Sequence, residues 1–243
     1  MTSEPTGAWQ ERSIGRDRAL VKNVGAATMV FARGPALGES DRTRRLGRIV
    51  DGLPGVLHSI GHCRQVHGAA VHRIGVRENG VEVVGDGDGL VTDRPGHGAL
   101  VWTADCVPVL IAGADVVAAV HSGWRGSAAD IVGTAVGVLE RTFGAAPRTL
   151  RAALGPSVCG RCYRVGPEVP VALAAFGLDE HRWLDGDHVD LRGFLATRLE
   201  ALGVPPEEIE TVGGCTVESP DLASFRRDGE AAGRQWSMVC LKG

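Results

Sequence analysis

Residues 99–126 read ALVWTADCVPVLIAGADVVAAVHSGWRG. Three apolar runs within this stretch, at 99–104, 107–112 and 116–120, have the length of strands and contain no charged residue. A continuous apolar run bounded by turn residues is typical of a strand that is buried in the protein. The stretch therefore predicts buried strands at the centre of the fold.

On either side of this stretch, the spacing of apolar residues alternates between helical and strand periods. The expected strands are 26–31, 71–76, 81–84, 150–154 and 235–241, and the expected helices are 41–50, 131–143, 167–176 and 191–202. Ser127-Ala128-Ala129-Asp130 resembles a capping box ahead of the second helix, and Asn79-Gly80 predicts a hairpin between two of the strands. Interleaved strands and helices with glycine-rich joints indicate an α+β protein built in layers.

Length and composition exclude several classes of protein. The chain has 243 residues, a formal net charge of −3 and 44% apolar residues, which fits one domain with a real core and gives no bulk electrostatic reason to bind nucleic acid. Residues 1–18 are read as a polar N-terminal leader and 19–243 as a single catalytic domain. No apolar run is long enough to span a membrane and no secretory signal is found, so the expected location is the cytoplasm.

The six cysteines include one pair with metal-ligand spacing. In a chain of this length without a secretory signal, a disulfide framework is not expected. Cys159 and Cys162 have CxxC spacing, but a structural zinc site needs four ligands and no second such pair is present. Most of these cysteines are therefore expected to be buried thiols.

Polar residues at the ends of the apolar runs suggest a site. Neutral imidazole and thiolate bind zinc or copper, so His67, Cys106 and His121 could form a three-ligand centre with one open position. Their separations of 39 and 15 residues match no compact metal motif. Two hydrogen-bonded core histidines with a buried thiol remain the alternative, and His62 is a further candidate ligand. No His-x-His pair occurs, which excludes a trinuclear copper cluster.

Arginines near these residues suggest an anion site. Trp124 and Arg125 follow His121 and precede an expected helix, and both an arginine and a helix N-terminus favour an anion. A packed tryptophan beside a surface salt bridge is the alternative. The basic residues of 224–229 and 233–235 form a second cluster, which is typical of a solvated face.

Ordered motifs over roughly residues 60–241 resemble one family, the YfiH-type purine nucleoside phosphorylases. The family is also called polyphenol oxidase, laccase-domain protein and peptidoglycan editing factor. The motifs that carry the resemblance are QVHG (65–68), DGLVT (88–92), TADCVPVL (103–110), AVHSGWRG (119–126), LGPS (154–157), YRVGPE (163–168), CT (215–216), SFRRDG (224–229) and GRQ (233–235).

The resemblance implies a layered αββα sandwich with mixed sheets, like that of the toxin cytotoxic necrotizing factor. It implies that His67, Cys106 and His121 bind zinc, with copper as an alternative. The implied activity is phosphorolysis of adenosine, inosine and methylthioadenosine, with adenosine deamination as a second reaction. Transferase, hydrolase and oxidoreductase activities have all been assigned to such proteins, with phenol oxidation expected to be a side activity at most.

Roles for individual residues follow from the resemblance. Cys106, Asp105 and His67 are expected to be catalytic, with Asp105 as a proton shuttle or as a residue that orients a ligand. Gln65, Trp124, Arg125 and Arg226 are expected to bind a small-molecule nucleoside and phosphate, because guanidinium groups hold phosphate with paired hydrogen bonds. As an alternative, Cys106 acts as a nucleophile.

The N-terminal third departs from the family pattern, because Phe31-Ala32-Arg33-Gly34-Pro35 runs almost directly into Asp41-Arg42. Residues that normally line one side of the pocket are expected to be missing. Three alternatives to the phosphorylase therefore stay open: a peptidoglycan-precursor editing amidase, a specialised paralogue with an altered substrate, and a scaffold that keeps a structural metal. The sequence leaves the oligomeric state unknown.

Overall fold

Strands from both ends of the chain meet in one sheet. The computed structural model describes residues 7–34, 39–53, 57–75 and 80–242. In spatial order the seven-stranded sheet contains β1 Gln10–Ile14, β2 Asp17–Val24, β3 Ala27–Arg33, β15 Gln235–Leu241, β8 His97–Thr103, β4 Ser59–Arg64 and β6 Gly80–Asp86. The last strand, β15, pairs antiparallel with both β3 and β8, so it joins the N-terminal hairpins to the middle of the chain.

A second sheet packs against the first. In spatial order it contains β14 Ile209–Thr211, β11 Arg151–Leu154, β9 Val107–Ala112, β10 Val117–Ser122, β7 Gly89–Thr92 and β5 Val71–Arg73, and a separate hairpin pairs β12 Leu184–Asp185 with β13 His188–Val189. The three apolar runs form the predicted buried strands, but they belong to different sheets: β8 to the first, β9 and β10 to the second. The chain therefore crosses between the sheets at residues 104–106.

Alternate side chains of the central strands enter different cores. Leu110 of β9 and Val101 of β8 pack together between the two sheets, where side chains from both are fully buried. Val109 faces the opposite side of the second sheet, and Trp102 faces the opposite side of the first. Because side chains alternate along a strand, one strand in each sheet supports two apolar layers, which explains the absence of polar positions in these runs.

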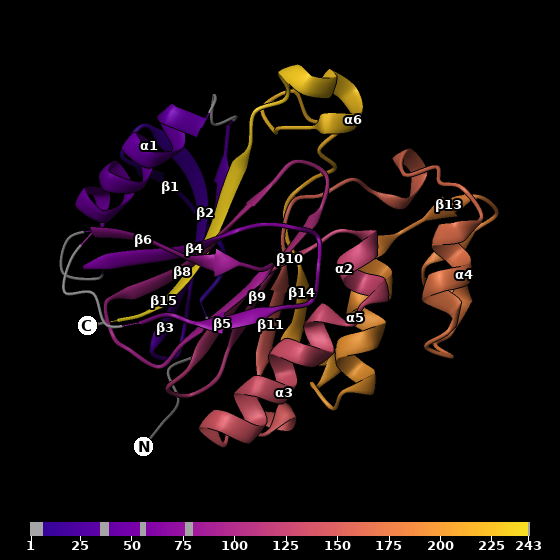
Figure 1. Ribbon diagram of the computed structural model, residues 1–243, viewed down its shortest axis with the longest axis horizontal. Coiled ribbons are helices and arrows are strands. Elements are labelled where there is room, and N and C mark those ends of the chain that lie inside the picture. The colour runs from indigo at the N-terminus through magenta and orange to yellow at the C-terminus, as the bar shows by residue number, and fades with distance from the viewer. Residues whose placement is uncertain (1–6, 35–38, 54–56, 76–79, 243) are drawn as a thin grey trace.

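Helices cover the outer face of each sheet. Their bounds are α1 Glu39–Gly52, α2 Trp124–Ala128, α3 Ile131–Phe143, α4 Glu168–Ala174, α5 Leu191–Ala201 and α6 Phe225–Asp228, with short 3₁₀ turns η1 Pro147–Thr149, η2 Gly160–Cys162, η3 Glu180–Arg182, η4 Pro206–Glu208 and η5 Gly229–Ala231. Leu46 and Ile49 of α1 are buried on the first sheet, and α3 and α5 bury Val132, Leu139 and Phe194 on the second. Figure 1 shows α1 on one side of the sheets and α2, α3 and α5 on the other, which confirms the layered α+β architecture. Among the described residues, no helix has the length and apolar character needed to cross a membrane.

The expected helix at 131–143 forms, but its cap differs from the expectation. Asp130 is the N-cap of α3, in the left-handed conformation with φ of 59°, and its side chain accepts a hydrogen bond from Gly133 N–H. Arg198 of α5 forms two further hydrogen bonds to this carboxylate, at 2.7 and 3.0 Å. Ser127 instead lies inside α2 and hydrogen-bonds Ser122, so the capping box predicted there is wrong.

The predicted hairpin around Asn79-Gly80 does not form. β5 pairs parallel with β7 in the second sheet, whereas β6 pairs parallel with β4 in the first. A half-buried strand pattern specifies which face is apolar but not which strand is the neighbour, and here the two strands lie in different sheets. Residues 76–79 lie outside the described part of the chain.

Part of the predicted polar leader belongs to the first sheet. Residues 10–14 form β1, which pairs along its whole length with β2, and β2 begins at Asp17. Asp17 is almost fully buried: it accepts hydrogen bonds from the Trp236 indole at 2.9 Å and from Arg45 Nε at 2.6 Å. Residues 10–18 are therefore integral to the fold, and residues 1–6 of the expected leader lie outside the described residues.

We expect Asp17→Ala to lower the free energy of unfolding by about 2–4 kcal/mol, because it leaves a buried indole N–H and a guanidinium without their acceptor. Urea denaturation followed by tryptophan fluorescence measures the change. The matched control is Asp86→Ala, which removes an ion pair between Arg64 and Asp86 that is exposed on both sides. If the two variants have equal free energies of unfolding, the buried contacts of Asp17 do not stabilise the fold and the structural role of residues 10–18 is contradicted.

Candidate metal and substrate site

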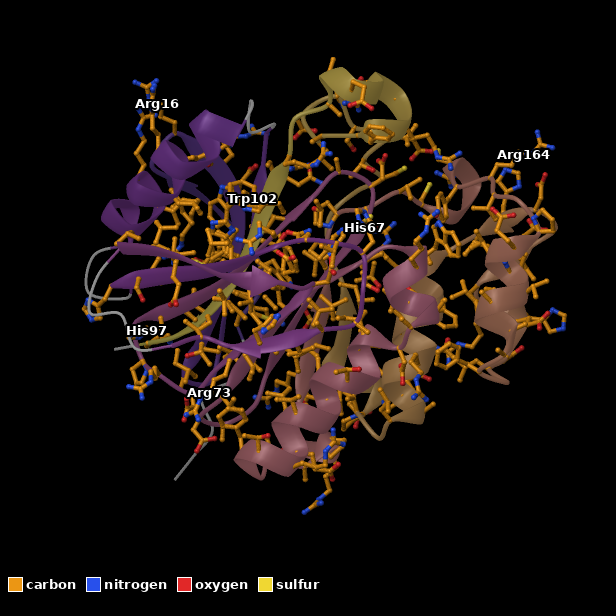
Figure 2. All side chains as sticks on the ribbon, in the orientation of Figure 1. Arg16, His67, Arg73, His97, Trp102 and Arg164 are labelled. Carbon is orange, nitrogen blue, oxygen red and sulfur yellow. The ribbon has the colours of Figure 1, made fainter. Side chains whose placement is uncertain are left out.

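Three side chains with metal-binding atoms meet where the chain crosses between the sheets. Cys106 lies in the crossing itself, His121 is in β10, and His67 lies in the loop after β4. One ligand atom from each lies within 4.8 Å of the other two. The imidazole rings of His67 and His121 meet edge to face with their centroids 4.9 Å apart. His121 is buried and His67, which is labelled in Figure 2, is exposed, so solvent reaches the cluster on the His67 side.

Asp88 is the buried carboxylate that arranges this cluster. Its side chain has no exposed surface, and Oδ1 lies 2.8 Å from Nδ1 of His121. The same carboxylate accepts hydrogen bonds from the backbone N–H groups of Val66 at 3.2 Å, His67 at 3.0 Å and Gly68 at 2.7 Å. It therefore fixes the ring of one histidine and the backbone of the other, and leaves Nε2 of His121 directed away from Asp88.

The charges of the cluster stabilise a thiolate beside an imidazolium when no metal is bound. Burial alone would raise the pKa of Cys106, but His121 and His67 lower it to about 6. Burial alone would lower the pKa of His121, but Cys106 and Asp88 raise it to about 9. The pKa of Asp88 is also lowered, because hydrogen bonds from His121 and from backbone N–H groups outweigh its burial.

Backbone strain is concentrated at this site. His67 and Asp105 have φ values of 61° and 81°, in the region that residues with a side chain rarely adopt. Gly123 lies against the cluster, and a Cβ there would come within 2.9 Å of the Cys106 sulfur and 3.3 Å of the His67 ring. The surrounding structure thus holds two strained residues and one glycine so that the three ligand atoms can approach one another.

Asp105 connects the cluster to the C-terminal part of the chain. Its Oδ1 accepts a hydrogen bond from Thr216 Oγ1 at 2.5 Å, and Oδ2 accepts one from the backbone N–H of Arg226 at 2.7 Å. Its carbonyl oxygen accepts a third from Val158 N–H. Both carboxylate oxygens are thus engaged, which favours a positioning role for Asp105; its expected role as a proton shuttle stays a prediction.

Two arginines lie at the exposed side of the site. Arg226 stacks on the ring of Tyr163 with 4.9 Å between the guanidinium carbon and the ring centroid, and Arg125 stacks on Trp124 at 4.5 Å. Burial and the Cys106 sulfur raise the pKa of Tyr163 to about 12, against the opposing influence of Arg226 and Arg125. Tyr163 therefore lies within electrostatic range of the thiol and of both arginines, which brings these sequence-predicted residues together.

Gln65 lies at the edge of the site and is bound to the first sheet. Its Nε2 donates to the carbonyl oxygen of Trp102 at 2.7 Å, and its Oε1 accepts from the N–H of Trp102 at 2.8 Å. Because the Gln65 side chain bonds both backbone groups of Trp102 in β8, as a neighbouring strand would, it anchors the loop that carries His67. Its predicted contact with substrate stays a prediction. His62, the alternative ligand, is half-buried in β4 and belongs to neither cluster of potential ligands among the described residues.

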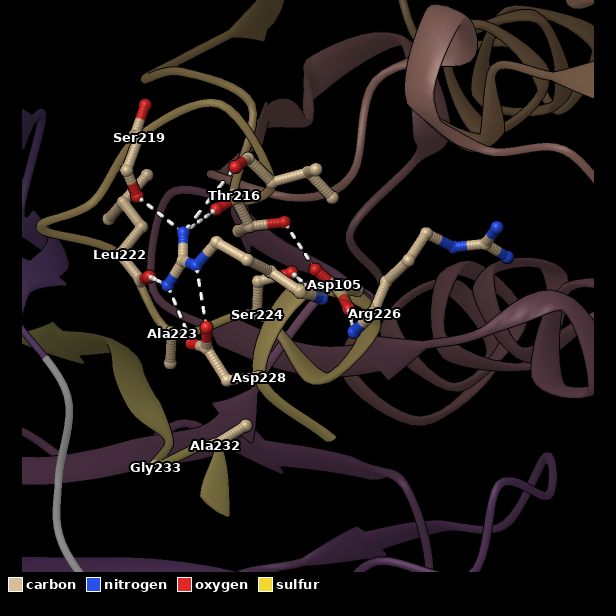
Figure 3. Close-up of polar contacts among 12 residues, drawn as sticks. Asp105, Thr216, Ser219, Leu222, Ala223, Ser224, Arg226, Asp228, Ala232 and Gly233 are labelled. Atoms are coloured by element: carbon tan, nitrogen blue, oxygen red, sulfur yellow. Dashed lines mark hydrogen bonds and ion pairs between the residues drawn. The ribbon is translucent and has the colours of Figure 1, made fainter. Parts of the chain in front are cut away.

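The C-terminal basic cluster is more than a solvated face. Arg227 donates from its guanidinium to the carbonyl oxygens of Thr216, Ser219 and Leu222 at 2.7–2.9 Å, and it pairs with Asp228. Figure 3 shows this network, with the side chain of Arg226 extending away from it. One arginine therefore organises the loop while its neighbour is presented to the site.

Sequence reasoning did not assign roles to Asp88, Tyr163 and Thr216. The signal for Asp88 was an acid placed directly before an apolar strand, since such a group must be paired when buried. Tyr163 is the only tyrosine in the chain and belongs to a motif that the resemblance used. Thr216 also belongs to such a motif, but its role could not be assigned because its contact with Asp105 joins residues 111 positions apart.

Known proteins resemble this chain in sequence. Residues 43–242 match the family model described as multi-copper polyphenol oxidoreductase laccase. A purine nucleoside phosphorylase of Mycobacterium tuberculosis is 39% identical over 214 residues, which span 86% of this chain and 81% of that protein. A purine nucleoside phosphorylase of Deinococcus radiodurans is 38% identical over 162 residues, which span 64% of this chain and only 62% of that protein.

Solved structures resemble it in fold. YlmD from Geobacillus stearothermophilus superposes with a TM-score of 0.84 at 25% identity, covering 97% of this chain and 99% of that one. The YfiH protein of Bacillus licheniformis gives a TM-score of 0.81 at 24% identity, covering 92% and 96%. With most of its length matched by the family model, and with these relatives, the chain belongs to the family described as multi-copper polyphenol oxidoreductase laccase, which is the YfiH-type family that its motifs resemble.

Proposed function

We propose that this protein is a zinc-dependent purine nucleoside phosphorylase of the cytoplasm that acts on adenosine, inosine and methylthioadenosine, with adenosine deamination as a second activity. The observation that carries the proposal is the meeting of His67, Cys106 and His121 within 4.8 Å, beside two arginines at an exposed edge. The names of the relatives support a phosphorylase.

The donor set fits zinc better than it fits a buried hydrogen-bonded group. Two imidazoles and a thiolate are zinc ligands, and the thiolate is the form that the lowered pKa of Cys106 favours. Asp88 holds Nδ1 of His121, as a carboxylate commonly does behind a metal-bound imidazole. Copper fits the same donors, so the metal in the cell is part of the proposal. When bound, the metal would supply a Lewis acid and a water molecule of lowered pKa.

The residues of the chain supply binding and orientation for phosphorolysis. Arg125 and Arg226 would hold a phosphate dianion through paired N–H···O bonds, with one oxygen facing C1′ of the nucleoside. As that oxygen bonds to C1′, the bond from C1′ to the purine nitrogen breaks and its electron pair passes to the base. The ring of Tyr163 and the backbone bond from Arg226 to Asp105 keep the arginine in place.

Two exposed apolar side chains support a purine as the substrate. Val66 is 56% exposed and Phe225 is 46% exposed, although large apolar residues of this chain are mostly buried. Val66 directly precedes the ligand His67, and Phe225 directly precedes Arg226. An aromatic ring next to a phosphate-binding arginine suits a planar base joined to a ribose.

A thiol hydrolase is a second candidate, because Cys106, His121 and Asp88 form a thiol–imidazole–carboxylate sequence. In this reading Cys106 would attack the carbonyl carbon of an amide, as an amidase that uses a thiol nucleophile to edit peptidoglycan precursors would. A thiolate that is bound to zinc is a poorer nucleophile, so the two candidates make opposite demands on the metal. Zinc must activate the phosphorylase and inhibit the amidase.

The first test is product chromatography after zinc-loaded protein has been incubated with adenosine. We expect adenine and ribose 1-phosphate only when phosphate is present, and inosine from the second activity with or without it. His121→Ala is the control, since it removes a ligand and is expected to abolish both products. Absence of any product from the zinc-loaded wild type would overturn the phosphorylase assignment.

Replacing Arg226 with alanine tests the phosphate site. The variant keeps the backbone N–H that binds Asp105 and loses only the guanidinium, so we expect the KM for phosphate to rise about 10-fold to 100-fold, which corresponds to roughly 1.5–3 kcal/mol for a charge-assisted hydrogen bond. The KM for adenosine should change by less than about twofold, because the variant does not alter the residues that bind the base. The matched control is Arg73→Ala, which removes an arginine that pairs with Asp93 and lies on the side of the molecule away from α6 (Figure 2). Equal rises in both KM values would refute a specific role in binding phosphate.

Alkylation of Cys106 separates the metal site from the nucleophile. In metal-free protein, iodoacetamide should modify Cys106 with a half-maximal rate near pH 6, because His121 and His67 lower the pKa of the thiol to about 6. Since this pKa is lowered, the reactive thiolate is present above pH 6 and is lost as the pH falls through that value. Peptide mass spectrometry distinguishes Cys106 from Cys162, whose pKa is raised to about 12. Zinc in excess over the chain should block the reaction; unchanged alkylation in its presence would favour the thiol hydrolase.

A further inference from the structure

A second group of potential metal ligands lies in two loops of the C-terminal half. Cys159 precedes η2 and Cys162 is its last residue, in the loop after β11, and Cys215 and Glu218 lie in the loop after β14. One ligand atom from each of these four residues lies within 4.8 Å of the other three. The group shares no residue with the cluster of His67, Cys106 and His121. The CxxC pair thus finds two further ligands, which the sequence did not indicate because one is 53 residues away and the other is a carboxylate.

The chemistry of the four donors matches a closed tetrahedral site. Three thiolates select zinc over the hard cations that prefer oxygen, and a carboxylate oxygen is an accepted fourth ligand. Sulfur atoms bound to one zinc at about 2.3 Å lie roughly 3.8 Å apart, so the observed spacing needs only a small contraction. Four protein ligands leave no open position, which is the pattern of a structural centre rather than a catalytic one.

The surroundings of Cys215 and Glu218 already provide the outer contacts that such a centre needs. The Cys215 sulfur is buried and lies 3.3 Å from the backbone N–H of Cys159, and the N–H groups of Glu218 and Val217 also lower the pKa of this thiol against the effect of its burial. Backbone N–H groups directed at a sulfur favour its thiolate. Arg161 reaches Glu218 at 3.0 Å, so a cation already offsets part of the negative charge that three thiolates and a carboxylate would carry.

A disulfide explains these positions less completely. A disulfide would join two of the three sulfurs and would not explain why the third thiol and Glu218 lie beside them. The Cys162 sulfur lies 3.7 Å from Oε1 of Glu218, which a metal site explains. All six cysteines of the chain are unpaired in the structure. The convergence of a carboxylate on three thiols distinguishes a metal site from a redox pair.

We propose that Cys159, Cys162, Cys215 and Glu218 bind a structural zinc ion that joins the loop after β11 to the loop after β14.

This zinc ion would stabilise the two loops that contact Asp105, beside the cluster of His67, Cys106 and His121. Beside the cluster, Ser157 and Cys215 form an isolated β-bridge, and Thr216 N–H donates to the carbonyl oxygen of Ser157 at 3.0 Å. Thr216, next to Cys215, donates to Asp105, which directly precedes the first-site residue Cys106. The closed centre therefore fixes two loops that both contact Asp105, and its role is to position rather than to react.

Metal content of the full-length protein tests the proposal without reference to activity. We expect zinc-loaded wild type, kept reduced and freed of loosely bound metal, to hold two zinc ions per chain by inductively coupled plasma mass spectrometry, one for each cluster. Cys159→Ser and Cys162→Ser should each reduce this to one, and His121→Ala should do so independently. The combination of Cys159→Ser with His121→Ala should hold none. Cys240→Ala and Glu207→Gln, a buried thiol and an exposed acid outside both clusters, should keep both ions.

Cobalt substitution reports the ligands directly and does not depend on stability. In His121→Ala protein, which lacks the first site, Co²⁺ should give the intense visible bands of tetrahedral coordination and a near-ultraviolet thiolate-to-cobalt band. Glu218→Gln should shift the visible bands and weaken binding by at least about tenfold, since it exchanges an anionic ligand for a neutral one. A folded Glu218→Gln variant with an unchanged spectrum would remove Glu218 from the site.

The outcomes separate this proposal from the proposed function. If wild type holds a single zinc that Cys159→Ser removes and His121→Ala does not, the structural centre stands and the catalytic metal fails. A single zinc that persists in Cys159→Ser and disappears in His121→Ala overturns the structural centre alone. Recovery of a disulfide among Cys159, Cys162 and Cys215 from protein prepared without reductant but with excess zinc also overturns it.

Discussion

The hydrogen bonds of Asp88 are the interaction on which the candidate site depends. One fully buried carboxylate accepts from the ring of His121 and from three consecutive backbone N–H groups that include His67. A buried negative charge is tolerated only when its partners compensate the loss of water, and here those partners are the site itself. Because His67 has a left-handed backbone, the loop needs a fixed anchor, and Asp88 provides one from the position directly before β7. The geometry of both histidines is thus set by one residue that carries no reactive role.

The crossing between the two sheets explains why the thiol lies beside this carboxylate. β8 and β9 are buried on both faces, and the residues that connect them, 104–106, place Asp105 and Cys106 between two apolar strands. The crossing brings Cys106 to the end of β10 at which His121 lies, and Asp105 in the crossing has a φ of 81°. Three hydrogen bonds to Asp105, from Val158, Thr216 and Arg226, oppose this strain. Packing of the sheets and arrangement of the ligands are therefore consequences of the same local sequence.

Local patterns predicted the elements of the fold well, and long-range contacts explain where they failed. Buried runs and helical periods located β8, β9, β10, α3 and α5, because the spacing of apolar residues shows which face of an element is buried. Strand partners were missed: β5 and β6 look like a hairpin but lie in different sheets. Similarly, β1 and β2 were hidden by polar residues, since β1 is an edge strand with exposed positions. The candidate ligands His67, Cys106 and His121 were assigned through family resemblance, and their spacing alone left the assignment open. Asp88 and Thr216 act through partners 33 and 111 positions away, which no local pattern contains.

Hydrogen bonds to Asp105 connect the two clusters of potential ligands: one comes from the N–H of Val158, which precedes Cys159, and another comes from Thr216. Cys106 follows Asp105, and Cys215 precedes Thr216, so the contact from Thr216 Oγ1 to Asp105 Oδ1 joins neighbours of a ligand in each cluster. Movement of the loop that carries Cys215 would release one of the three hydrogen bonds that Asp105 accepts, and its strained backbone would then be free to relax. Relaxation would displace Cys106, because the two residues share a peptide bond. A closed metal centre at the second cluster would prevent this by fixing the loop at its base. The strained thiol-bearing segment is thus held from two directions: by Asp88 and the histidines on the sheet side, and by Thr216 and the proposed structural centre on the loop side.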